Sequence, residues 1–208
     1  MIVATGSVAG PVGYASTPGG VPVSPVASVF TAAEVLAGAE LPVANDAGVE
    51  AVVVWDPIGG PIGVSVAESL SAAGRTVVFV TPDQIVGNEL ARSGDLAPAN
   101  NRVQQAGIAI ERRTLLREVH DEEVEVEDRF SGVRRRIGFA AFVDAGHRLP
   151  GDALFTALAG TRADVGGAGD AVAPRMIAEA MLSGRFAALA LDGFGRLSDG
   201  VAFPLAAH

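Results

Sequence analysis

The chain has 208 residues, and its 24 acidic and 15 basic side chains give a formal net charge of −9. Every basic side chain is an arginine and cysteine is absent. This composition excludes disulfides, thiolate catalysis, Cys-ligated clusters and lysine Schiff bases in this chain. The acidity argues against nucleic acid as a partner, because phosphate binding needs a basic face.

The hydropathy pattern predicts a folded protein without a membrane segment. Hydrophobic residues make up 49% of the chain, which argues against intrinsic disorder. The first charged residue is Glu34, so the basic segment of a secretory signal is missing. Prolines interrupt the uncharged N-terminal stretch, and no run of about 18 apolar residues occurs. We therefore expect no membrane contact and a cytoplasmic location.

The N-terminal part predicts little regular structure. Residues 1–7 indicate a short apolar strand that runs into a turn, and residues 8–28 indicate an extended connection. A short helix is predicted over Thr31–Gly38, with Thr31 as N-cap and Glu34 at the capping-box position.

A strand, a glycine-rich turn, a helix and a second strand follow within about 30 residues, the nucleotide-binding half-unit of a doubly wound α/β fold. The strands are predicted from unbroken apolar runs. The four elements are Ala51–Trp55, Asp56–Gly63, Ser65–Ala73 and Thr76–Val80.

The later elements alternate in type. Residues 95–107 predict a helix, and Val119–Phe130 with Val133–Val143 predict an antiparallel pair of strands. Pro174–Leu191 predicts a long helix with proline in its first turn. The acidic run 118–128 indicates either solvated strands with cross-strand charge pairing or a docking surface.

Two groups of residues invite a binding interpretation on their own. Gly60 and Gly63 fit the second and third glycines of a G-x-G-x-x-G turn, with Gly59 beside them, but Ile58 occupies the first glycine position. The acid expected at the end of the second strand is missing, the nearest being Asp83. The turn is therefore either a nucleotide cradle or a glycine turn kept for packing, and NAD(P)H is a possible but doubtful ligand.

The cluster from His120 to Glu123 contains metal-ligand residue types. Adjacent residues of a strand point to opposite faces, so these side chains cannot converge on one ion. We assign no metal ligand and no catalytic residue.

Five segments resemble, in the same order, the C-terminal FAD/NAD(P)-binding region of multidomain flavoenzymes. The family is that of trimethylamine dehydrogenase and 2,4-dienoyl-CoA reductase, related to old yellow enzyme. Its members have an FMN and iron–sulfur barrel, followed by two domains similar to the FAD and NAD(P)H domains of glutathione reductase. The segments are MIVATGS, SVFTAAEVLAG, VVVWDPIGGPIGVSVAESLSAAG, VTPDQIVGNEL and GDAVAPRMIAEAMLSGRFAAL.

The resemblance implies an α/β fold with a Rossmann-like three-layer domain and an incomplete second domain of the same kind. Residues 1–44 would end an FAD-like half-domain and connect onward, 45–149 would form the NAD(P)-binding-like domain, and 150–208 would form the returning FAD-like half with a tail. The barrel and the first FAD-like half have no counterpart here. We therefore expect a protein partner that supplies both.

The resemblance also implies a nucleotide site for FAD or ADP. Asp170 would accept hydrogen bonds from ribityl or ribose hydroxyls, although it could instead be a carboxylate that only stabilises a helix N-terminus. Arg148 matches a common family arginine, in either a ligand or a structural role. The cofactor-binding residues implied by the resemblance are Ala4, Thr5, Gly6, Gly169, Asp170 and Ala171, and the glycine turn adds Gly59, Gly60 and Gly63 as candidates.

The implied function is an accessory FAD- or ADP-binding subunit of a flavin-dependent oxidoreductase. A further role in this reading would be to relay electrons between NAD(P)H and a partner's flavin and iron–sulfur centres. The alternative is a non-catalytic adenine-nucleotide-binding or structural subunit of an oligomeric oxidoreductase.

Overall fold

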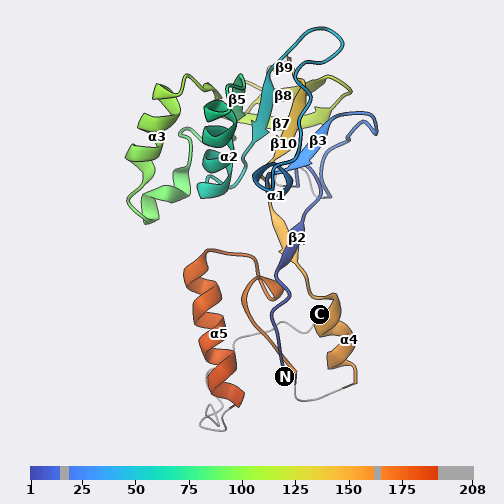
Figure 1. Ribbon diagram of the computed structural model, residues 1–208, viewed down its shortest axis with the longest axis vertical. Helices are drawn as coiled ribbons and strands as arrows, with labels where there is room; N and C mark the ends of the chain where they lie inside the picture. Colours follow the sequence, from blue (N-terminus) through green and yellow to red (C-terminus); the bar gives the residue numbers. More distant parts are fainter. Residues whose placement is uncertain (15–18, 162–164, 192–208) are drawn as a thin grey trace. The chain divides into compact units, whose positions relative to one another are not determined.

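The computed structural model describes residues 1–14, 19–161 and 165–191 (Figure 1). The chain divides into two compact units. The terminal unit consists of Met1–Ala9 and Arg148–His208, and the sheet unit consists of Gly10–His147. Both chain ends therefore contribute to one unit, and the continuous middle of the chain forms the other.

The sheet unit is built on a five-stranded parallel sheet with the order β3-β10-β4-β5-β6. Its central strands are almost entirely apolar and buried on both faces, as expected for a parallel sheet covered on each side. The strands are β3 (Val29–Thr31), β4 (Val52–Trp55), β5 (Val77–Val80), β6 (Ala109–Glu111) and β10 (Ala141–Asp144).

Helices cover one face of this sheet (Figure 1). The predicted capping box is present, since Thr31 accepts from the Glu34 N–H and the Glu34 carboxylate accepts from the Thr31 N–H. Apolar residues of α2 and α3 meet the inward-facing valines of β4 and β5 in one buried cluster. The elements are α1 (Ala32–Leu36), α2 (Pro61–Ala72), the 3₁₀ helix η1 (Asn88–Arg92) and α3 (Leu96–Gln105).

A three-stranded antiparallel sheet covers the other face, with the order β7-β8-β9. Its inner side chains, among them Val124 and Val126, pack with Trp55, Phe139 and Phe142 in a second buried cluster. The strands are β7 (Thr114–Val119), β8 (Glu123–Asp128) and β9 (Arg134–Gly138). The three layers confirm the predicted α/β Rossmann-like class.

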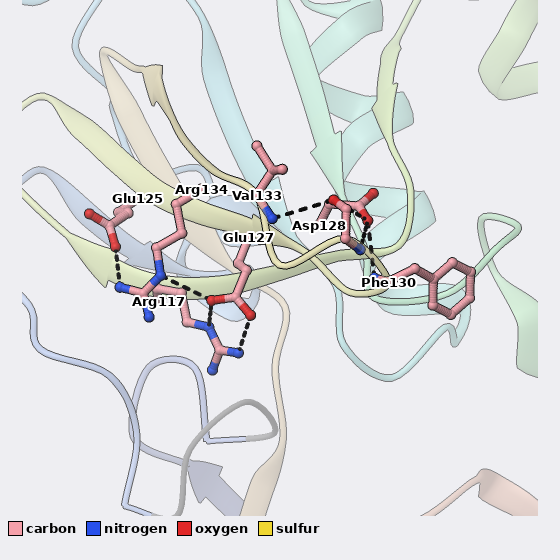
Figure 2. A network of polar contacts seen from close by, with 8 residues as sticks. Arg117, Glu125, Glu127, Asp128, Phe130, Val133 and Arg134 are labelled. Atoms are coloured by element: carbon pink, nitrogen blue, oxygen red, sulfur yellow. Dashed lines mark hydrogen bonds and ion pairs between the residues drawn. The ribbon is translucent and has the colours of Figure 1, made fainter.

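The outer face of this antiparallel sheet carries the ion pairs in Figure 2. Glu127 lies between Arg117 and Arg134, at 2.8 Å and 3.0 Å, and Arg134 also reaches Glu125 at 2.8 Å. The arginines lower the pKa of Glu127 through these hydrogen bonds. Cross-strand charge pairing is therefore confirmed for the acidic run.

Several predicted elements were wrong in extent. Val133–Val143 is not one strand: β9 ends at Gly138, and after Phe139 and Ala140 the chain enters the parallel sheet as β10. The unbroken apolar run hid this change, because a buried parallel strand has no alternating pattern. Helix α2 begins at Pro61 and not at Ser65, since proline is well suited to a first helical position.

The terminal unit has little sheet. A parallel pair joins β1 (Ile2–Val3) to β12 (Gly166–Gly167), and an antiparallel pair joins β2 (Ser7–Ala9) to β11 (Arg148–Pro150). The helices are α4 (Ala153–Ala159), the 3₁₀ helix η2 (Gly169–Ala171) and α5 (Ile177–Leu191). Helix α5 begins three residues after the predicted Pro174, which lies outside it. The predicted tail 193–208 lies outside the described residues.

Large apolar side chains are exposed on the terminal unit. On α5, Ile177 is 78% exposed and Met181 is 70% exposed, and Met1 and Val8 are exposed as well. Among the described residues, no helix is both long and apolar enough to cross a membrane.

Candidate functional site

The terminal unit brings together six of the nine predicted cofactor-binding residues. Strands β1 and β12 run parallel, and the Ala168 N–H donates to the Val3 carbonyl at 3.0 Å, just beyond the paired residues. Ala4–Gly6 leaves the carboxyl end of β1, and Gly169–Ala171 leaves the carboxyl end of β12. Segments about 160 positions apart in sequence therefore meet at one edge, where ligands bind in open α/β sheets.

A chain of hydrogen bonds fixes Asp170 at this edge. The Ser7 hydroxyl donates to Asp170 Oδ2 at 3.1 Å and accepts from Arg148 Nε at 2.7 Å. Arg148 also donates to the Ser7 carbonyl, so the structure gives it a structural contact to the loop. Arg148 acts on the carboxylate through Ser7 and holds the serine proton on the side facing Asp170.

Two glycines shape the backbone next to Asp170. Gly6 and Gly169 have positive φ values of 80° and 66°, which favour glycine. No atom lies within 4 Å of a Cβ built on Gly6, so the space beside it is open. The Gly169 N–H donates to the Ser183 hydroxyl on α5 at 2.8 Å, which ties the turn to that helix.

The residues of this edge fit a nucleotide that carries hydroxyl groups. Asp170 is half-buried and ionisable, and its carboxylate is a suitable acceptor for ribityl or ribose hydroxyls. Helix α5 begins only at Ile177, so Asp170 does not lie in its first turn. Asp170 lies instead in the first turn of the 3₁₀ helix η2, so its two interpretations, a cofactor ligand and a helix-end carboxylate, both stay predictions.

The other three predicted residues lie in the sheet unit, at the turn between β4 and α2. Gly60 is the N-cap of α2, and Gly63 lies in its first turn. The buried side chain of Asp56, which is 1% exposed, occupies the inside of this turn. Asp56 Oδ1 accepts from the N–H groups of Ile58 and Gly59, each at 3.0 Å.

The second oxygen of Asp56 is buried without a hydrogen-bond partner. A Cβ built on Gly63 would lie 2.6 Å from this oxygen, so the carboxylate fills the space that the glycine leaves. Burial raises the pKa of Asp56 to about 6, although the two N–H groups favour the ionised form. The turn therefore already contains an anionic group of the chain itself.

Asp83 stands at the mouth of the same turn. A Cβ on Gly59 would meet Asp83 Oδ2 at 2.8 Å and the Asn88 nitrogen at 3.1 Å. The Glu89 N–H donates to the Gly59 carbonyl at 2.9 Å, so the start of η1 covers this side of the turn. Partial burial raises the pKa of Asp83, and Arg129 opposes the shift.

A second carboxyl group with a raised pKa lies at the end of β10. Burial raises the pKa of Asp144 to about 6, and its Oδ1 accepts from the Gly146 N–H at 2.8 Å. Asp144 thus holds the glycine turn that follows it, as Asp56 does after the neighbouring strand β4.

The acidic segment after β7 lines a hollow of about 510 Å³ with Asn45 and Val49. Glu122 Oε1 accepts from the Asp46 N–H at 2.7 Å, and Glu123 pairs with Arg136. These carboxylates are therefore used within the fold. In the described ranges, no three or more metal-ligating side chains converge on one point.

Sequence reasoning missed Ser7 and the inward position of Asp56. The sequence gives no signal for Ser7, because its partner Asp170 lies 163 residues further along the chain. The sequence does give a signal for Asp56: this acid comes directly after an unbroken apolar strand and before a glycine turn, a place where burial is expected.

Solved structures of known proteins share the fold of this chain. Histamine dehydrogenase from Rhizobium sp. 4-9 is 27% identical over 90% of this chain, with a TM-score of 0.82. The 6-hydroxypseudooxynicotine amine oxidase of Pseudomonas geniculata N1 is 25% identical over 89%, with a TM-score of 0.78. The chain resembles the FAD-binding region of the trimethylamine dehydrogenase and 2,4-dienoyl-CoA reductase family. The resemblance inferred from the sequence is thereby confirmed.

The match to this family is partial in length. The chain spans 30% of the histamine dehydrogenase chain and 28% of the amine oxidase chain. Thioredoxin reductase from T. acidophilum shares the fold at 17% identity and a TM-score of 0.60, over 93% of this chain and 66% of its own. No protein-family model and no curated protein sequence matches the chain. The chain is thus related to flavin-dependent oxidoreductases through one region of them.

Proposed function

We propose that this chain is the accessory FAD- or ADP-binding part of a flavin-dependent oxidoreductase, with its nucleotide site in the terminal unit. The carrying observation is the convergence of Ala4–Gly6 and Gly169–Ala171 at the carboxyl end of a parallel strand pair, with Asp170 held by Ser7. In this proposal Asp170 accepts from nucleotide hydroxyls, and the open space at Gly6 lets the backbone approach the ligand.

A bound flavin would supply the electron transfer, and the chain would supply its position. Ser7 keeps one Asp170 oxygen oriented, and Arg148 holds the serine hydroxyl in place by donating to it. The link from Gly169 to Ser183 holds the turn against α5, so the backbone is ordered before the ligand arrives.

A protein partner completes the terminal unit in this proposal. The parallel pair has only two residues in each strand, whereas parallel sheets normally occur buried within larger sheets. The exposed apolar side chains of α5, among them Ile177 and Met181, offer a surface for such a partner. The partner's further contribution would be the FMN and iron–sulfur barrel.

The test is to purify the chain alone and with co-expressed products of neighbouring genes, and to identify any nucleotide released on denaturation. FAD or ADP released from the complex supports the proposal, and a flavin absorption spectrum separates FAD from ADP. A complex free of nucleotide contradicts it.

A second function is favoured by the occupied turn of the sheet unit. If ADP is released and the complex does not oxidise NADH or NADPH, the chain is a non-catalytic nucleotide-binding subunit. Electron relay from NAD(P)H requires a second nucleotide site, and Asp56 occupies the turn where that site would lie.

A further inference from the structure

We infer that the glycine turn of the sheet unit is closed by the chain's own carboxylates, with Asp56 in the role of the turn's anion, and does not accept the pyrophosphate of a dinucleotide. This inference refines the proposed function: the chain has one nucleotide site, in the terminal unit, and NAD(P)H does not deliver electrons through the sheet unit. Its evidence comes from a different part of the molecule and can fail separately.

Three positions around the glycine turn have no free N–H donor for a phosphate. A dinucleotide phosphate is held by the backbone N–H groups of such a turn and of the helix that follows. Here the N–H groups of Ile58 and Gly59 both donate to Asp56 Oδ1. Pro61, the first residue of α2, has no N–H group. The donors that would receive a phosphate are therefore depleted at three of the positions around the turn.

The space beside two of the turn's glycines is taken by other atoms of the chain. The glycines of a nucleotide-binding turn leave room for the ligand and for close packing of helix and strand. At Gly63 that room is filled by the Asp56 carboxylate, and at Gly59 it is bounded by Asp83 and the Asn88 backbone. Packing within the chain is thus a sufficient reason for both glycines.

Negative charge gathers at this turn. Asp56 lies inside the turn and Asp83 at its mouth, and Glu89 raises the pKa of Asp83 by its own negative charge. Arg129 lowers the pKa of Asp83 and donates to the Pro82 carbonyl, and Glu89 pairs with Arg92 at 3.2 Å. A pyrophosphate placed here would face two carboxylates in a poorly hydrated site, where like charges repel more strongly than in water.

The test uses the full chain with ¹⁵N-labelled glycine, followed by NMR during titration with NADH, NADPH and inorganic pyrophosphate. Labelled Gly59, Gly60 and Gly63 report on the sheet unit, and Gly6 and Gly169 report on the terminal unit. We expect the first three signals to stay unmoved up to millimolar ligand. A saturable shift of these signals by any of the three ligands overturns the inference.

A positive readout comes from pH. The Gly59 N–H donates to Asp56, so its signal should follow the protonation of that carboxyl with a midpoint at about pH 6. Asp56→Asn should remove this titration. Glu68→Gln, which removes a carboxylate of the same helix that pairs with Arg102 of α3, should leave it intact. A Gly59 titration that survives Asp56→Asn contradicts the assignment of Asp56 as the anion of the turn.

The two proposals fail in distinguishable ways. ADP that shifts Gly6 and Gly169 but not Gly59–Gly63 supports both. ADP or NADH that shifts only Gly59–Gly63 contradicts both, because the nucleotide site would then lie in the sheet unit.

Discussion

Each unit of this chain has a glycine-containing turn at the carboxyl end of a parallel strand, and the two turns differ in what lies beside their glycines. In the sheet unit, a complete five-stranded sheet buries Asp56, and the carboxylate occupies the turn. In the terminal unit, a two-residue strand pair supports an open turn at Gly6, with Asp170 fixed beside it. The space beside Gly63 in the sheet unit is therefore filled, whereas the space beside Gly6 in the terminal unit is open.

This contrast separates stability from binding. The sheet unit has two buried clusters, one on each face of its parallel sheet. The terminal unit exposes Ile177 and Met181 and has few buried side chains to hold the open turn. A nucleotide and a partner would both supply contacts that this unit lacks, so their binding should be linked to its folding.

The largest expected effect is a difference in stability between a substitution in the core of the sheet unit and one on the exposed surface of α5. Phe142 is fully buried against Phe139, so Phe142→Ala should lower the free energy of unfolding by about 3–5 kcal/mol. Ile177→Ala, at a side chain that is 78% exposed, should change it by less than about 0.5 kcal/mol. Denaturant unfolding measures both, and equal losses would show that the α5 surface is already buried in the isolated chain.

The next effect is a pH dependence of the sheet unit. Asp56 binds its proton more tightly in the folded chain, where its pKa is about 6, than in an unfolded chain with a value of 3.8. Its contribution to stability is therefore full below about pH 4 and is lost as the pH rises through about 6. The difference corresponds to about 3 kcal/mol.

Asp56→Asn should therefore remove much of the decrease in the free energy of unfolding between pH 4 and pH 7. Burial also raises the pKa of Asp144 to about 6, so Asp144→Asn should remove a further part of this loss of stability. Unfolding curves at several pH values measure the effect. A slope unchanged in Asp56→Asn would mean that this carboxyl is not buried as described.

A smaller effect compares two glycines in helices. Gly63→Ala should destabilise the sheet unit by about 1–2 kcal/mol, because the added Cβ would lie 2.6 Å from Asp56. The cost of this steric clash outweighs the gain in helix propensity. Gly184→Ala on α5, where the Cβ meets no atom within 4 Å, should stabilise its helix by up to about 1 kcal/mol.

Thermal unfolding followed by circular dichroism distinguishes the two glycine substitutions. Adding Asp56→Ala to Gly63→Ala should recover part of the loss, because the carboxylate that collides with the new methyl group is gone. A double variant that shows no recovery would place the strain elsewhere.

The smallest effect concerns the capping box of α1. Thr31→Ala removes the hydroxyl that accepts from Glu34 and should cost about 1 kcal/mol. Thr31→Ser keeps the hydroxyl and should remain close to the wild type. Equal losses in the two variants would assign the effect to the threonine methyl group.

Local signals in the sequence were sufficient for the sheet unit. The apolar runs of β4 and β5, the capping box of α1 and the glycine turn were all visible, since each depends on neighbouring residues. The break between β9 and β10 was not visible, because burial on both faces removes the alternation that separates strands.

The candidate site depends on contacts between the two ends of the chain. The resemblance placed Asp170 and the Ala4–Gly6 turn at a nucleotide, but nothing local to either segment shows that they meet. The hydrogen bonds of Ser7 to Asp170 and Arg148 join positions 163 and 141 residues apart. The inward position of Asp56 also needed the structure, because an exposed and a buried acid look the same in sequence.

The most direct test of the central claim is the affinity for FAD and for ADP of the chain assembled with its partner, in the wild type and in Asp170→Asn. We expect one nucleotide per chain and a loss of affinity of about tenfold or more in the variant, because a hydrogen bond to a charged acceptor is weakened. Asp152→Asn, which removes an exposed carboxylate of the same unit, should leave the affinity unchanged. Equal affinity in Asp170→Asn and the wild type would contradict a nucleotide site at the carboxyl ends of β1 and β12.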